Sequence, residues 1–212
     1  MRLFFFLFFS FLTLNATIIL DKKEVINLLE YSEIYHDVGN KETIFSILSK
    51  EDKFETTKKE AIDYCNLTPE GVWLKFKIKN PKNKTINKIL TIDNLSTERI
   101  DLYKIKNKNV VSKKTTGIYH LKKFDGTIDY SLPISIKANS TESYYLNVKN
   151  EKLSLWFKPQ LYEPREFYRK DTLKQIMWAL FFGGIFSLII YNIFLFVFTR
   201  DKIYLSYFLY LI

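Results

Sequence analysis

The chain has 212 residues and a formal net charge of +9, and 26% of its residues are charged. The positive charge comes from lysines scattered along the middle of the chain, a pattern typical of a solvated surface. The sequence has no clustered basic helix and no zinc-ligand spacing, so we expect no nucleic-acid partner. Its 19 Phe and 14 Tyr are concentrated partly in two apolar ends, which predicts a protein directed to a membrane.

The N-terminus has the pattern of a secretory signal peptide. Met1 and Arg2 are followed by an apolar run to Leu14 that is too short to span a bilayer. We predict a signal peptide at residues 1–16, with cleavage after Ala16; the alternative is an uncleaved anchor, which would also export the middle segment of the chain. The single cysteine, Cys65, permits no disulfide within the chain. An exported domain without disulfides fits a bacterial periplasm better than a eukaryotic cell surface.

Residues 17–163 are predicted to form one antiparallel β-sandwich. Several short segments alternate apolar and polar residues and are separated by Asn-, Gly- and Ser-containing turns, which is typical of such sandwiches. These segments are Val72–Lys79, Ile86–Asp93, Arg99–Lys106, Tyr130–Lys137, Glu142–Lys149 and Leu153–Tyr162. The stretch before them is less regular. We expect a short helix in Asp21–Leu29 and a helical turn over Thr43–Leu48, with Thr43 as its cap.

The alternation also predicts which side chains face the core and which face outward. The residues expected in the core are Leu74, Phe76, Ile100, Leu102, Tyr144, Leu146, Leu155 and Phe157. Four outward aromatic residues, Trp73, Tyr103, Tyr145 and Trp156, are interleaved with charged and amide side chains. Such a face resembles a platform for a sugar or a small polar ligand. The alternative is that the N-terminal segment or a partner covers this face.

No catalytic constellation is visible. The two histidines, His36 and His120, lie in unrelated segments, and no His, Cys or carboxylate pair has metal-ligand spacing. We therefore predict no catalytic residues, no metal and no cofactor in this part of the protein.

The C-terminal part is predicted to enter the membrane. We expect a connecting helix at residues 164–175 that begins with Pro164. Ile176–Thr199 contains no charged residue, and as a helix it would be roughly 36 Å long, enough to cross a hydrocarbon core of about 30 Å. A short cytoplasmic loop at 200–202 and the start of a second span at 203–212 come next. The chain would thus be the front of a longer polytopic protein. Flanking charges do not settle its orientation, and the signal peptide places residues 17–175 outside the cytoplasm.

Two blocks of the sequence resemble bacterial seven-transmembrane receptors with diverse intracellular signalling modules (7TMR-DISM). The first is Val72–Pro81 (VWLKFKIKNP), followed in order by Ile92–Asn94, Ile100–Tyr103 and Tyr144–Val148. The second is Leu180–Gly184 with Tyr191-Asn192, Arg200-Asp201, Tyr204 and Tyr207. The blocks resemble the type 2 extracellular domain and the first helix, loop and second helix of the seven-helix region.

This resemblance implies a periplasmic sensory domain with a jelly-roll fold similar to carbohydrate-binding modules. It also implies seven helices in the inner membrane, a cytoplasmic kinase or cyclase output, and a homodimer formed through that cytoplasmic region. After Gly117 the loop departs from the family pattern, and no ligand identity is transferred. We expect the input half of a signalling receptor with a small-molecule or carbohydrate ligand. The alternatives are a membrane-tethered binding or adhesion module without signalling output, and an exported scaffold attached to a cytoplasmic enzyme.

Overall fold

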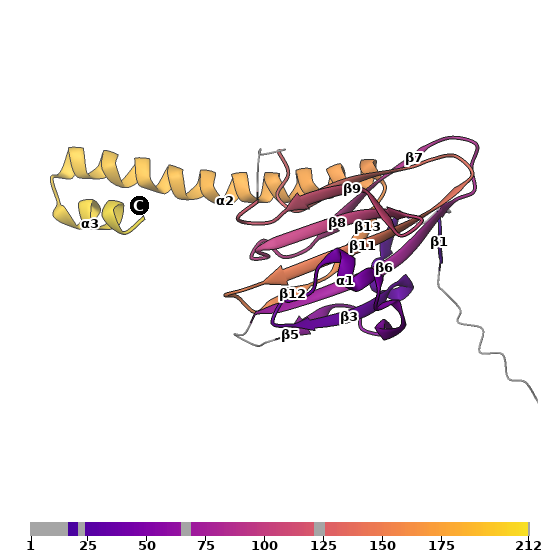
Figure 1. The fold of residues 1–212 in the computed structure, drawn as a ribbon. Helices are drawn as coiled ribbons and strands as arrows, with labels where there is room; N and C mark the ends of the chain where they lie inside the picture. Colours follow the sequence, from indigo (N-terminus) through magenta and orange to yellow (C-terminus); the bar gives the residue numbers. More distant parts are fainter. Residues whose placement is uncertain (1–16, 21–23, 65–68, 121–125, 212) are drawn as a thin grey trace, which may run out of the picture.

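The computed structural model describes residues 17–20, 24–64, 69–120 and 126–211. The signal peptide predicted at residues 1–16 and Cys65 lie outside these ranges. The chain forms a β-sandwich from which one long helix projects (Figure 1).

The sandwich has a large and a small antiparallel sheet. In the described residues, the large sheet has the order β4 (Glu55–Thr56), β3 (Glu33–Val38), β6 (Glu70–Asn80), β11 (Ser140–Asn150), β8 (Arg99–Lys106) and β9 (Asn109–Thr116). Strand β1 (Thr17–Ile19) joins this sheet by pairing in parallel with the end of β6. The small sheet has the order β10 (Tyr130–Ile136), β7 (Ile86–Ile92), β13 (Pro159–Tyr162) and β2 (Val25–Asn27). A further pair joins β12 (Leu155–Phe157) to β5 (Ile62–Tyr64).

The main core lies between the two sheets. All eight residues predicted to face inward, including Leu74, Phe76 and Leu146, are buried there. The small sheet contributes Leu90, Leu132 and other apolar residues from its facing side. The chain changes sheet at each step from β6 to β8 and again from β9 to β11, as in a jelly roll. The predicted β-sandwich is therefore confirmed.

Most predicted strands are present, and the differences have local causes. The segment predicted as one strand, Leu153–Tyr162, is divided at Lys158 into β12 and β13, which belong to different sheets. Strand β9 was not predicted, because its sequence NVVSKKTT does not alternate regularly and is mostly exposed. It pairs with β8 through a tight turn in which Asn107 and Lys108 have positive φ.

The N-terminal segment differs more from expectation. The helix predicted at Asp21–Leu29 is not found in the described residues of that stretch. Val25–Asn27 form strand β2, and a 3-10 helix, η1 (Leu28–Tyr31), follows it. Because Ile26 and Leu29 are both buried against the sandwich, tertiary packing overrides the local pattern. The turn predicted at Thr43 is confirmed as α1 (Ile44–Leu48), which Thr43 and Ser46 close with a capping box. A second 3-10 helix, η2 (Glu51–Lys53), follows α1.

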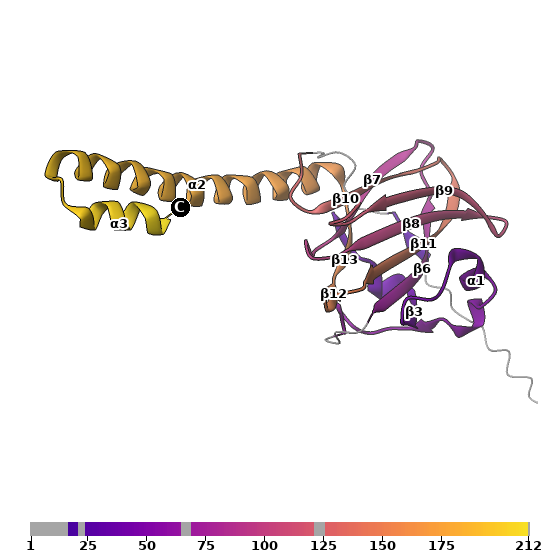
Figure 2. The same cartoon turned by 60° about the vertical axis from the view of Figure 1, so that its left-hand side comes forward.

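Helix α2 (Pro164–Thr199) is continuous through both the predicted connecting helix and the predicted span. Pro164 begins it, and Arg200 ends it in a left-handed conformation. Its apolar part is long enough to cross a membrane, and it is exposed beyond the sandwich. Helix α3 (Lys202–Leu211) turns back beside it, as both views show (Figure 2).

Candidate functional site

Three of the four predicted platform residues lie together on the outer face of the large sheet. Tyr145 on β11 is directly opposite Tyr103 on β8, and Trp73 on β6 stacks on Tyr103 with ring centroids 5.8 Å apart. The alternation of the strands predicts this grouping, because all three side chains point away from the main core.

These three rings are covered. Trp73, Tyr103 and Tyr145 are only 1%, 7% and 3% exposed. Ile44, Ile47 and Leu48 of α1 pack on them and form a second apolar cluster with Phe54 at its margin. The expectation of an open aromatic platform is therefore wrong, and the alternative of a cover formed by the N-terminal segment is the observed arrangement. The cover forms because α1 has its own apolar face, which needs a buried partner.

Trp156 lies elsewhere. It is 40% exposed and belongs to β12, where it pairs with Asp63 of β5, outside the large sheet. The four predicted residues thus do not form one surface. A role for any of them in contacting a ligand stays a prediction.

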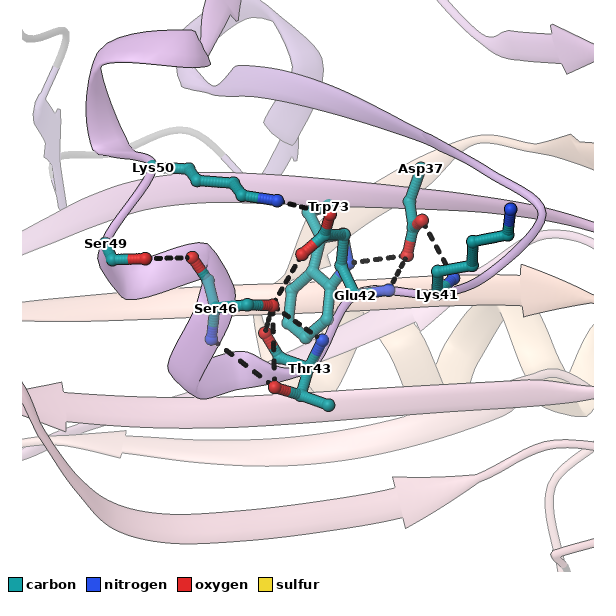
Figure 3. A network of polar contacts seen from close by, with 8 residues as sticks. All are labelled: Asp37, Lys41, Glu42, Thr43, Ser46, Ser49, Lys50 and Trp73. Carbon is teal, nitrogen blue, oxygen red and sulfur yellow. Dashed lines mark hydrogen bonds and ion pairs between the residues drawn. The ribbon is translucent and has the colours of Figure 1, made fainter.

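The cover, which we define as residues 39–56, is anchored by Asp37 at the end of β3 (Figure 3). The buried carboxylate of Asp37 accepts hydrogen bonds from the backbone N–H groups of Lys41 (3.0 Å) and Glu42 (2.9 Å). The indole N–H of Trp73 also points at this carboxylate, at 3.5 Å. One acidic side chain therefore ties the start of the cover to the ring beneath it.

A second set of contacts holds α1 itself. Glu42 accepts hydrogen bonds from Lys50 (2.5 Å) and from the Ser46 hydroxyl (2.5 Å), as Figure 3 shows. The hydrogen bonds from Lys50 and Ser46 hold the pKa of Glu42 below its usual value. Charged and polar side chains of the cover thus hold the two ends of α1 together through contacts within the cover itself.

A pocket of about 260 Å³ opens where the cover ends. We call it the lysine pocket. It is lined by Lys75 and Lys77 of β6, Lys108 of the β8–β9 turn, Ser143 and Tyr145 of β11, and Glu51 of η2. The alternation of Val72–Lys79 places Lys75 and Lys77 on the same outward face as Trp73. No such pattern places Glu51 and Lys108 beside them, because only the fold brings η2 and the β8–β9 turn beside β6.

Glu51 of the cover makes polar contacts with two residues that line this pocket. Its carboxylate accepts a hydrogen bond from the Tyr145 hydroxyl (3.1 Å) and lies 3.6 Å from the Lys75 ammonium. Burial, and next the charge of Glu51, raise the pKa of Tyr145, so its hydroxyl stays protonated and donates. Lys75 is also paired with Glu33 at 3.2 Å.

The opposite side of the sandwich is fixed to the first turns of α2, a contact that we call the helix joint. Lys174 donates to both carboxylate oxygens of Asp129, at 2.8 and 2.6 Å. The buried carboxylate of Asp171 accepts from the backbone N–H of Ile128 (2.8 Å). Phe167 is buried against Ile89 of the small sheet. The helix that leads to the membrane is thus packed and ion-paired to the sandwich. Sequence reasoning predicted the helix but not these partners.

Among the residues that the structure describes, no group of three His, Cys, Asp or Glu side chains is placed to hold a metal ion. His36 pairs with the buried Glu70 and stacks on Tyr64, with ring centroids 4.0 Å apart. His120 lines a separate surface hollow near Arg99 and Tyr119. The two histidines therefore lie apart, in different surroundings.

Comparison with known families agrees with this arrangement of a sandwich on a membrane helix. The family model described as 7TMR-DISM extracellular 2 matches residues 29–163, and the model described as 7TM diverse intracellular signalling matches residues 174–212. The matches define the class: the extracellular sensor region of a seven-transmembrane signalling receptor. The chain belongs to the 7TMR-DISM extracellular 2 family, whose model covers more than half of it.

Solved structures with a related shape are remote. One is TmCBM61 in complex with β-1,4-galactotriose, with 8% identity, a TM-score of 0.33, and coverage of 61% of this chain and 86% of that chain. Another is the C-terminal CBM6 of LamC, a marine laminarinase from Zobellia galactanivorans, with 9% identity, a TM-score of 0.27, and coverage of 61% of this chain and 98% of that chain. No curated protein matches this chain.

Proposed function

We propose that this chain is the input half of a bacterial signalling receptor, with residues 17–175 in the periplasm and α2 in the inner membrane. The sandwich binds a small molecule or a carbohydrate, and the bound state is passed to the membrane helices. The observation that carries this proposal is the helix joint. A domain that was only tethered to the membrane would need no buried Asp171 and no paired Lys174 to fix it to the helix.

The joint can transmit a signal because a hydrogen bond, an ion pair and an apolar contact attach α2 to the sandwich. Asp171 accepts a hydrogen bond from the Ile128 backbone, and Phe167 packs against Ile89. These two contacts fix the rotation of α2 about its axis and its position along that axis relative to the small sheet. A ligand that binds more tightly to one of two sandwich arrangements shifts the population of that arrangement. A helix fixed at three points moves with the sandwich, whereas a helix on a loose linker does not.

The test has a binding stage and a coupling stage, both on the full chain in lipid nanodiscs. The thermal midpoint is first screened against sugars and small polar metabolites. A ligand present at 100 times its dissociation constant stabilises the fold by about 2.7 kcal/mol. Hydrogen exchange over residues 164–175 is then compared with and without each stabilising ligand. We expect ligand-dependent exchange at the joint.

Asp129→Asn tests whether the joint carries the signal. This variant loses the Asp129–Lys174 ion pair and leaves Lys174 only the longer pair with Asp93, at 3.7 Å. It should bind the ligand as before, while the ligand-dependent exchange at 164–175 is reduced. Glu166→Gln is the matched control, because Glu166 pairs with Arg169 within α2 itself. If ligands bind but never change exchange at the joint, the protein is a tethered binding module and the signalling proposal fails.

A further inference from the structure

The lysine pocket is unusual in its charge. Three lysines, Lys75, Lys77 and Lys108, line it together with one carboxylate, Glu51. Only Lys75 has acidic partners; in the described part of the chain, Lys77 and Lys108 form no ion pair. Like charges brought together at one cavity raise the local potential and attract anions.

The protein already places a carboxylate at this spot. Glu51 lies between the Tyr145 hydroxyl and the Lys75 ammonium, and it comes from η2, at the edge of the cover. Its side chain is 42% exposed, so it can turn into water without leaving a buried charge. Lys77 lines the same pocket and adds a further positive charge to it. The Glu51 contact therefore indicates which functional group the pocket accepts.

The remaining walls favour an organic molecule. Ile105 and the edge of Tyr145 supply apolar atoms, and Ser143 and Asn107 supply polar groups beside them. Ligand sites of this mixed composition fix a carbon body by contact area and its orientation by a few polar groups. The volume of about 260 Å³ is suited to one small molecule.

From these observations we infer that the lysine pocket binds a small organic acid, whose carboxylate replaces that of Glu51 at Lys75 and Tyr145. Binding releases Glu51 and so removes one of the contacts that close the cover over the aromatic cluster. This inference deepens the proposed function and rests on it, because it names the class of ligand and the segment that responds.

The inference is tested by titration calorimetry at low ionic strength on the full chain in nanodiscs. D-galacturonate and D-galactose are compared because a carboxylate is the main difference between them; succinate is a second acid, and inorganic phosphate is an anion without a carbon body. We expect both acids to bind. Galactose should bind at least about tenfold more weakly than galacturonate, because it lacks the charge that pairs with the lysines in partly screened surroundings.

Variants locate the site. Lys77→Gln should weaken binding of galacturonate several-fold, and Glu51→Gln should strengthen it, because the competing charge is gone. Lys79→Gln is the matched control. Lys79 is the next residue on the same face of β6 after Lys77, and it does not line the pocket. Hydrogen exchange at residues 49–56 should rise when galacturonate binds to the native chain.

Three results would overturn the inference. They are equal binding of galactose and galacturonate, tighter binding of phosphate than of either acid, and equal effects of Lys77→Gln and Lys79→Gln. A failure here is distinguishable from a failure of the proposed function. If a neutral sugar binds and changes exchange at the helix joint while no acid binds, the receptor role stands and the organic-acid ligand is wrong.

Discussion

Both faces of the large sheet carry buried apolar residues, but for different reasons. The inner face packs against the whole small sheet and forms one continuous core around residues such as Leu74 and Leu146. On the outer face, the cluster around Trp73, Tyr103 and Tyr145 is covered by a five-residue helix, α1, and its flanking turns. The inner cover is a layer of the fold, whereas the outer cover is a local segment held by Asp37, Glu42 and Glu51. Because a small local segment can unfold without the rest of a domain, we expect the cover to open while the sandwich stays folded.

The largest expected effect comes from the inner face. Leu146→Ala removes a fully buried side chain between the sheets and should lower the free energy of unfolding by about 2–5 kcal/mol. Urea denaturation followed by tryptophan fluorescence measures it. Thr141→Ala, on an exposed position of the same strand, is the control, with an expected change within about 0.5 kcal/mol. A similarly small loss for Leu146→Ala would contradict the placement of β11 in the core.

A substitution in the cover should loosen the cover alone and leave the sandwich folded. Ile47→Ala removes a fully buried side chain of α1, and we expect a loss at the lower end of the same range, about 2 kcal/mol. Hydrogen exchange should speed up at residues 43–56, while β6 and β11 keep their protection. Phe45→Ala is the control, because Phe45 lies in the same helix and is largely exposed. Loss of protection throughout the large sheet would show that the cover and the sandwich open as one unit.

The smallest expected effect is a pH dependence of stability that comes from Glu142, on the inner face of the large sheet. Burial alone would raise the pKa of Glu142, but hydrogen bonds from Lys104 and Tyr144 outweigh it and hold the pKa below the ordinary value of 4.5. The folded state therefore binds a proton less readily than the unfolded state. The stabilisation is fully present above 4.5 and is lost as the pH falls through the lower pKa of the folded state.

This dependence is measured by thermal midpoints between neutral pH and about pH 3, a range that includes the ordinary pKa of a glutamate. The native chain should lose more stability on acidification than Glu142→Gln does. Parallel curves for the two proteins would mean that Glu142 has the same pKa in the folded and unfolded states.

The sequence predicted much of the sandwich because a strand with one buried face must alternate. Val72–Lys79 and Arg99–Lys106 show this period clearly, and both are strands with the expected inward residues. The same reasoning grouped Trp73, Tyr103 and Tyr145 on one face. It failed for β2, whose three residues are too short for a period to show, and for β9, whose side chains are mostly solvated.

The candidate site was much less predictable. Alternation places Lys75 and Lys77 outward, but it does not say what lies above them. Glu51 reaches Lys75 and Tyr145 only because α1 packs on the aromatic rings, and Lys108 joins them only through the β8–β9 turn. The partners of Lys174 and Asp171 in the helix joint are likewise distant in the chain, and no local pattern relates them.

The alternating strands, the capped turn at Thr43 and the long apolar helix follow from the sequence, since each depends on residues within a few positions of one another. Three features arise only in the folded chain: the aromatic cluster is covered, a basic pocket opens at the edge of the cover, and α2 is fixed to the small sheet. These features depend on which distant segments pack together. That choice is set by the burial of whole apolar faces, such as that of α1, and not by any short stretch of residues.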